Sequence, residues 1–343
     1  MLKISKDKLD LLFKKISAKF PLFMPIKKAG EVNYGLWTET SVSDLDTLKT
    51  VKSPKDLFFP QSEELMKFRL KDKQISIEDT RKENGIFVVM GVKACDYKAF
   101  EVLDNVFLSE PVDTYYKEKR DNGIIITLGC QTAEESCFCS TFGIDATSPK
   151  GDITTYIVDG DLYWNANTDK GEDLTTYIGE LLVETDDDKV VKQKASVKDL
   201  LSKLPLNNLD TSYFKDTELK DIFNSKEWNS LSESCLGCGT CTFVCPTCQC
   251  FDIRDFKTDN GVIRFRCWDS CMYQDFTQMA GGNNRTTQMQ RYRQRFMHKL
   301  VYYPNEHDGL FSCVGCGRCV NKCPQRLNIV KVIKTLGGKN DVK

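Results

Sequence analysis

The chain reads CLGCGTCTFVCP at residues 235–246 and CVGCGRCVNKCP at residues 313–324. Seven of the twelve positions are identical, so the two segments form an internal repeat. Both copies have the spacing C-x2-C-x2-C-x3-C-P, in which three closely spaced cysteines are followed by a fourth cysteine and a proline. The repeat accounts for eight of the sixteen cysteines in the 343 residues.

This spacing is the one with which bacterial ferredoxins hold [4Fe-4S] clusters. Three closely spaced thiolates bind one cluster, and in two-cluster ferredoxins the fourth cysteine binds the other cluster. Zinc modules separate their two cysteine pairs by about a dozen residues or more, so zinc is the weaker alternative. We predict that one cluster is held by Cys235, Cys238, Cys241 and Cys323. We predict that a second cluster is held by Cys313, Cys316, Cys319 and Cys245.

Composition narrows the class of protein. With 48 Lys and Arg against 49 Asp and Glu, the net charge of -1 argues against a general nucleic-acid-binding protein. Only two histidines are present, which leaves little scope for histidine-based catalysis. No apolar run approaches the ~18 residues of a membrane span, and residues 1–8 are too charged for a secretory signal. Sixteen cysteines in a chain of this size indicate metal binding in a reducing compartment, so we expect a cytoplasmic protein.

The region before the repeat has an alternating α/β pattern. Apolar runs at 86–90 and 124–128, joined by a helical pattern, predict a βαβ unit with parallel strands. Residues 154–158 and 162–165 flank Asp-Gly-Asp and predict a hairpin. A polar and charged stretch follows at 186–230. The predicted fold is an α/β (or α+β) N-terminal domain over 1–185, a linker with short helices over 186–230, and a mainly α-helical, dicluster ferredoxin-like C-terminal domain over 231–343.

Four cysteines lie in the predicted N-terminal domain. Cys95 and Cys130 each follow one of the parallel strands, so both are expected at the carboxyl edge of the sheet, where open α/β sheets bind ligands. Cys137 and Cys139 come within one short loop of Cys130. The pattern predicts a third [4Fe-4S] cluster, with zinc and free buried thiols as the alternatives. Its candidate ligands are Cys95, Cys130, Cys137 and Cys139.

The last four cysteines, and a basic region, lie towards the C-terminus. Cys248, Cys250, Cys267 and Cys271 either hold a further metal or are small buried residues and redox-active thiols near the clusters, and we favour the second interpretation. Residues 281–343 carry 12 Lys and Arg against 3 Asp and Glu. This positive charge is expected to offset the anionic clusters or to meet a partner. A nucleic-acid partner is not supported, since the sequence has no recognised nucleic-acid-binding motif.

Several segments resemble one known family. They are residues 235–255, 268–272, 279–283 and 293–299, the second cysteine run, and in the N-terminal part residues 93–96, 113–116 and 137–139. Together they are similar to a 4Fe-4S dicluster subunit that occurs as the beta subunit of cytosolic NiFe sulfhydrogenases and also in anaerobic sulfite reductases. The resemblance is weakest over 1–80 and 184–230.

The resemblance implies an electron-transfer component of an anaerobic oxidoreductase complex rather than a catalytic one. Its expected partners are a flavin- and NAD(P)H-binding subunit, and a catalytic subunit of the hydrogenase or sulfite reductase type. The chain has neither G-x-G-x-x-G nor a P-loop motif, so flavin or nicotinamide is expected on another subunit. The alternative function is a thiol or disulfide reductase that uses the cysteines outside the repeat beside a [4Fe-4S] cluster.

Overall fold

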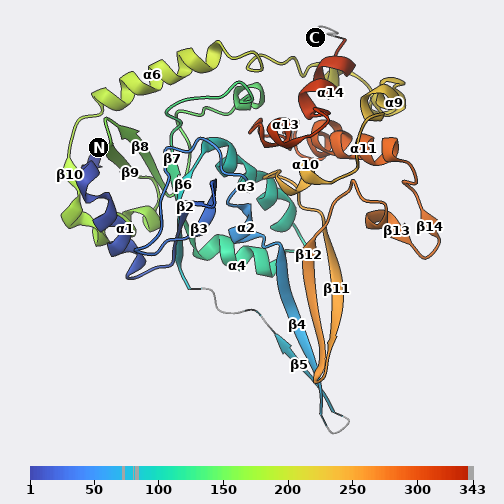
Figure 1. Ribbon diagram of the computed structural model, residues 1–343, viewed down its shortest axis with the longest axis horizontal. Helices are drawn as coiled ribbons and strands as arrows, with labels where there is room; N and C mark the ends of the chain where they lie inside the picture. Colours follow the sequence, from blue (N-terminus) through green and yellow to red (C-terminus); the bar gives the residue numbers. More distant parts are fainter. Residues whose placement is uncertain (72–73, 80, 82–84, 339–343) are drawn as a thin grey trace.

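The N-terminal part of the protein is built on an eight-stranded mixed sheet. The computed structural model describes residues 1–71, 74–79, 81 and 85–338 (Figure 1). The strand order of this sheet is β10-β1-β9-β8-β7-β6-β2-β3. In that order the strands span Val183–Glu184, Leu2–Ile4, Asp161–Ala166, Ile153–Val158, Gly123–Leu128, Phe87–Val92, Leu22–Lys28 and Glu31–Leu36.

The predicted βαβ unit is confirmed. β6 and β7 pair in parallel, and their connection holds helices α3 (Ala94–Phe107) and α4 (Thr114–Asn122). The predicted hairpin is also confirmed, since β8 and β9 pair antiparallel. Because β6 and β7 run in the same direction, the residues that follow them reach the same edge of the sheet.

Helices cover both faces of this sheet. On one face α1 (Leu9–Ser17) and α5 (Asp169–Tyr177) pack on inward-pointing strand residues such as Val88 and Ile126. On the other face α3, α4 and α2 (Lys55–Phe58) pack on the alternate residues, such as Val89 and Ile125. Both faces are buried, which explains why these strands are continuous apolar runs in the sequence.

A second sheet projects away from the body of the molecule (Figure 1). It has four strands in the order β11-β12-β4-β5, all antiparallel. Their bounds are Phe251–Thr258, Gly261–Trp268, Ser62–Lys71 and Gln74–Asp79. Strands from both sides of the predicted linker thus pair with each other. The predicted domain boundaries at 185 and 231 remain a prediction. This sheet pairs strands that lie before the first boundary with strands that lie after the second.

The C-terminal part is mainly helical, and it packs around one apolar core that includes Trp228, Tyr292, Phe296 and Ile333. Its longer helices are α11 (Gln288–Met297), continued by a π-helical turn (His298–Tyr302), and α14 (Ile329–Leu336). The helix α6 (Asp188–Ser202) precedes them in the chain and packs on the N-terminal part instead, against Tyr156, Tyr163 and Ala146. The short helices of the C-terminal part are α7 (Tyr213–Asp216), α8 (Leu219–Asn224), α9 (Glu227–Ser232), α10 (Thr240–Phe243), α12 (Tyr303–Glu306) and α13 (Arg318–Lys322). The predicted fold class is confirmed, with the β11–β12 hairpin as an addition that the sequence pattern did not predict.

The remaining elements are short. They are β13 (Gln278–Met279), β14 (Gly282–Asn283) and the 3-10 turns Lys6–Lys8, Cys139–Phe142, Gly179–Leu181 and Asp275–Thr277. Among the described residues, no helix combines the length and apolarity that crossing a bilayer requires.

Candidate metal centres

The structure brings each of the two predicted ligand sets together around a cavity. The first cavity is lined by three cysteines of the first run and one of the second run: Cys235, Cys238, Cys241 and Cys323. The second cavity is lined by three cysteines of the second run and one of the first run: Cys245, Cys313, Cys316 and Cys319. The crossing that the sequence predicts is therefore present in the arrangement of the thiols, while ligation itself stays a prediction.

Glycines give the backbone its path around the cavities. Gly237 and Gly239 in the first run, and Gly315 and Gly317 in the second, all have φ between +59° and +76°. This left-handed region is open to glycine at little cost. A short helix begins directly after Gly239, and another directly after Gly317. The backbone therefore turns in the same way in both cysteine runs.

The first cavity reaches the protein surface. Cys238 is exposed, and Leu236, which lines the same cavity, is 64% exposed. A hydrogen bond with the Thr240 hydroxyl is the main cause that lowers the pKa of Cys238. Deeper in the cavity, the Leu327 N–H donates to Cys323 Sγ at 3.3 Å. N–H and O–H donors directed at thiolates are the usual surroundings of protein-bound iron–sulfur clusters.

The second cavity is lined by two buried cations. Arg295 and Lys299 are 2% and 3% exposed, and both side chains line the cavity. Burial disfavours their charge, but the thiols of Cys245 and Cys248 more than offset it and raise the pKa of both groups, helped at Arg295 by Cys241. A guanidinium and an ammonium held in this way favour negative charge in the cavity.

Arg295 lies between the two cavities. Its guanidinium donates to the Cys241 carbonyl at 2.5 Å, and Cys241 lines the first cavity. The same guanidinium lies 3.2 Å from Cys248 Sγ, beside the second cavity. One buried positive charge is therefore shared by both centres.

The cavities fit iron–sulfur clusters better than single metal ions. In the parts of the chain that the structure describes, no three His, Cys, Asp or Glu side chains converge closely enough to hold one ion. A cube of iron and sulfide keeps its thiolates farther apart than one tetrahedral ion does. In addition, the buried Tyr292 hydroxyl, which lines the first cavity, has no hydrogen-bond partner among the described residues. A cluster bound there would offer it sulfur acceptors.

The structure also brings together the four cysteines of the predicted N-terminal site. Cys95 is the second residue of α3, three residues after the end of β6. Cys130 follows β7, and Cys139 begins a 3-10 turn two residues after Cys137. Burial, then the nearby thiols of Cys130 and Cys137, raise the pKa of Cys139 to about 12. Burial also raises the pKa of Cys95 well above its usual value, and the nearby Asp96 carboxylate and Cys316 thiol raise it further. Cys316 lines the second cavity, so this group of thiols lies next to it.

Of the four cysteines between the repeats, three hydrogen-bond with another cysteine and one has no thiol neighbour in the described part of the chain. The Cys248 thiol hydrogen-bonds with Cys245, and the Cys250 thiol hydrogen-bonds with Cys271. The hydrogen bond with Cys271 is the main cause that lowers the pKa of Cys250 to about 7. Cys267 lies on β12, with Arg254 rather than another thiol as the nearest charge.

Sequence reasoning did not find Lys55. This lysine is 3% exposed, donates to the Cys248 carbonyl at 2.8 Å and lies 3.6 Å from the centre of the Trp268 ring. Burial lowers its pKa to about 8. No local pattern marks this residue, because its neighbours come from a segment almost two hundred positions away.

Two comparisons with known proteins agree with this geometry. Residues 234–327 match the 4Fe-4S dicluster domain family. The chain is 32% identical over 293 residues, or 84% of each chain, to sulfhydrogenase 2 subunit beta from Pyrococcus furiosus. No solved structure matches. The dicluster domain carries two [4Fe-4S] clusters, which confirms the predicted cofactors of the repeat.

Proposed function

The chain belongs to the family of iron–sulfur subunits that includes the sulfhydrogenase beta subunit, and we propose that it transfers electrons between two other subunits of a redox complex. One partner is a flavin- and NAD(P)H-binding subunit, and the other is a catalytic subunit of the hydrogenase or sulfite reductase type. The complex works in the cytoplasm, where a reducing environment keeps sixteen cysteines free for metal.

The observation that carries this proposal is the adjacency of the two four-thiol cavities. Cys241 of the first cavity and Cys245 of the second are only four residues apart, within and just after the short helix α10. In the second run, Cys319 and Cys323 have the same relation with the roles of the cavities exchanged. Clusters bound there supply the acceptance and donation of single electrons.

The chain's own residues prepare the two sites for this task. Arg295 and Lys299 hold buried positive charge beside the thiols, which favours the more negative, reduced state of a bound group. The apolar core around Tyr292 and Phe296 excludes water from the deeper sides of the cavities. Excluding water and fixing charges near the sulfurs are the means by which proteins set cluster potentials.

The exposed edge at Cys238 is where electrons pass to or from another protein. Leu236 and Tyr273 are exposed around it, at 64% and 38%, and Tyr273 donates from its hydroxyl to the Cys238 carbonyl. No thiol around the second cavity is as exposed as Cys238, since Cys245, Cys313, Cys316 and Cys319 are all only partly accessible. Electron exchange with a partner is therefore expected at the first cavity.

The test is reduction by nicotinamide with and without a partner. The purified chain, mixed anaerobically with NADH or NADPH, is expected to keep the visible absorbance of oxidised clusters. Adding catalytic amounts of the flavoprotein subunit of the same complex is expected to bleach it. Reduction of the chain alone at the same rate would contradict the proposal, and so would failure of the flavoprotein to reduce it.

One contact favours a second candidate function, a thiol or disulfide reductase. Cys250 and Cys271 hydrogen-bond to each other near the second cavity, so oxidation of the two thiols to a disulfide would release two electrons and two protons close to an acceptor. This function predicts turnover of a disulfide substrate by the isolated, dithionite-reduced chain. Loss of that turnover in Cys271→Ser, with the iron content retained, would support it over the electron-transfer function.

A further inference from the structure

We propose that the N-terminal domain holds a third [4Fe-4S] cluster through Cys95, Cys130, Cys137 and Cys139, so that three centres lie in a row from the first cavity through the second into the sheet domain. This inference extends the proposed electron-transfer function. Only the role of the third cluster in electron transfer rests on that function. The site itself is argued from the positions of the four thiols, the charges around them and their contact with the second cavity.

Topology places the four thiols at one edge of the sheet. β6 and β7 are parallel neighbours, and Cys95 and Cys130 follow shortly after their carboxyl ends. The backbone N–H of Cys130 donates to the Ala146 carbonyl at 2.9 Å, which fixes the loop that carries Cys137 and Cys139 over this edge. Val197 and Leu201 of α6 close the group with an apolar wall. Cys137 lies beside Lys49.

Lysine side chains near the four N-terminal thiols favour a negatively charged group at this site. Lys93 is 6% exposed, and its ammonium lies in the field of the Cys130 and Cys95 thiols. On the outer side, the Lys49 ammonium lies beside Cys137, forms an ion pair with the Glu134 carboxylate at 3.0 Å and donates to the Ser136 hydroxyl at 2.6 Å, so Lys93 is the cation that depends most on the thiols. A buried ammonium is costly unless negative charge lies near it, and four thiolates on a [4Fe-4S] core carry net negative charge. The buried amide nitrogen of Gln131, next to Cys130, has no hydrogen-bond partner among the described residues.

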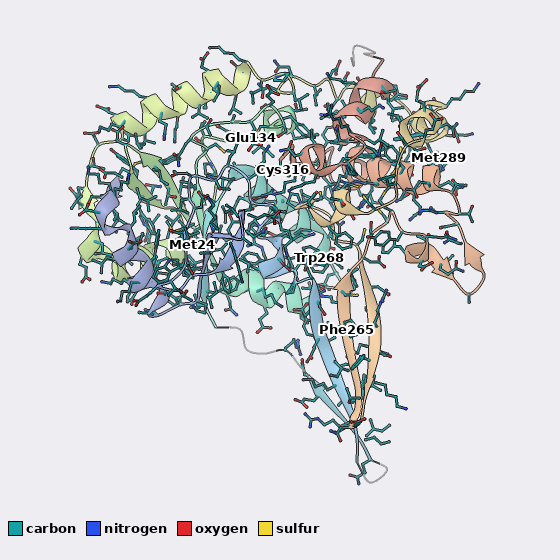
Figure 2. All side chains as sticks on the ribbon, viewed as in Figure 1. Met24, Glu134, Phe265, Trp268, Met289 and Cys316 are labelled. Carbon is teal, nitrogen blue, oxygen red and sulfur yellow. The ribbon has the colours of Figure 1, made fainter. Side chains whose placement is uncertain are left out.

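The thiol group is pressed against the loop of the second cavity. The Phe138 N–H donates to the Gly315 carbonyl at 3.0 Å, and the Phe138 side chain lines the second cavity itself. A Cβ atom on Gly315 would come within 2.3 Å of the Phe138 carbonyl oxygen, and one on Gly317 would come within 2.3 Å of the Ser136 carbonyl oxygen. Two backbone layers in direct contact are all that separates the thiol loop from the second cavity. In Figure 2 the labelled Cys316 lies where the sheet domain meets the C-terminal helices. It lies near Glu134, which belongs to the loop that carries Cys137 and Cys139.

The deciding experiment is metal analysis of the anaerobically purified full chain. Three clusters of four irons predict twelve irons and twelve acid-labile sulfides per chain, with three electron spins per chain after complete reduction. Cys130→Ser is expected to lower the iron content by a third and to remove one of the three spins. Cys267→Ser is the matched control, because this cysteine has no thiol neighbour, and it is expected to keep all twelve irons.

Several outcomes would overturn the inference. Two spins and eight irons in the unaltered chain would do so, and one zinc beside eight irons would assign the site to zinc instead. If Cys130→Ser does not fold, as judged by its far-ultraviolet circular dichroism, Cys137→Ser replaces it, with the same expected loss. The result is distinguishable from failure of the proposed function, because eight irons that are still reduced through the flavoprotein would remove the third centre and leave the electron-transfer role intact.

Discussion

Arg318 and Asp96 form a buried, two-pronged ion pair that joins the second cysteine run to the N-terminal sheet domain. The two guanidinium nitrogens donate to the two carboxylate oxygens at 2.6 and 2.7 Å, and the side chains are 4% and 2% exposed. Asp96 follows Cys95, and Arg318 lies between Cys316 and Cys319. The pair therefore fixes the distance between the N-terminal thiol group and the second cavity.

Asp96→Asn is expected to destabilise the protein by about 3–5 kcal/mol, because it leaves the Arg318 guanidinium buried without its counter-charge. The measurement is the midpoint of unfolding in urea, with circular dichroism as the signal. The matched control is Asp255→Asn, which removes a carboxylate from the exposed pair with Arg264 on the projecting sheet and is expected to leave the midpoint unchanged. Equal midpoints for the two variants would contradict this view of the interface.

Gly317→Ala is expected to loosen the contact between the two parts of the chain. A side chain there would meet the Ser136 carbonyl oxygen at 2.3 Å, and φ is +76°. Gly309→Ala is a close control, since φ is +79° and nothing lies within 4 Å of the added atom. Both variants carry the strain of the left-handed backbone, about 1–2 kcal/mol. Only Gly317→Ala is expected to lose a further ~1–3 kcal/mol from the clash, read as a lower thermal midpoint than that of the control.

Exchange of the fourth ligands is tested by serine substitution at Cys323 and Cys245. Cys323→Ser is expected to alter the electron paramagnetic resonance signal of the cluster in the first cavity, where Cys235, Cys238 and Cys241 lie. Cys245→Ser is expected to alter the signal of the other cluster. If each substitution perturbed only the cluster of its own cysteine run, the predicted ligation would be wrong.

Arg295→Gln is expected to lower the reduction potentials of both clusters, because it removes the buried positive charge beside Cys241 and Cys248. At an effective dielectric constant of ~20, this charge is worth about 1–2 kcal/mol at each site, on the order of 50–100 mV for one electron. Potentiometric titration measures the shift. Arg293→Gln on the same helix is the control, since that guanidinium lies 3.5 Å from the centre of the Phe223 ring and donates to the Phe223 carbonyl instead. A shift in one cluster only, or in neither, would rule out the shared role of Arg295.

The grouping of the cysteines around the two cavities was predictable, because it depends on short spacing in the sequence. Three cysteines at intervals of three wrap one centre whatever surrounds them, and the βαβ pattern of 86–128 is likewise local. The position of Cys95 and Cys130 at a common edge followed from the direction of two neighbouring strands. Each of these inferences needed only a few consecutive residues.

Contacts between distant segments were not predictable in this way. The projecting sheet pairs 62–79 with 251–268, and its exposed apolar residues, such as Ile77 and Phe256, give no one-sided pattern that marks a buried face. Lys55 and Asp96 have no local signal either, since the groups they meet, Cys248 and Arg318, lie about two hundred positions away. Pairing over such distances is decided by tertiary packing, which a single sequence does not display.

The exchange of cysteines between the two runs means that neither cavity can be completed by one run alone. The second cavity has its four thiols only when the polypeptide has been synthesised as far as Cys319, and the first only when it has reached Cys323. By then the β11–β12 hairpin between the two cysteine runs has also been synthesised. A chain that ends before Cys319 therefore offers only incomplete sites to the machinery that delivers iron. Colour in the mature protein then reports that both ends of this region have met.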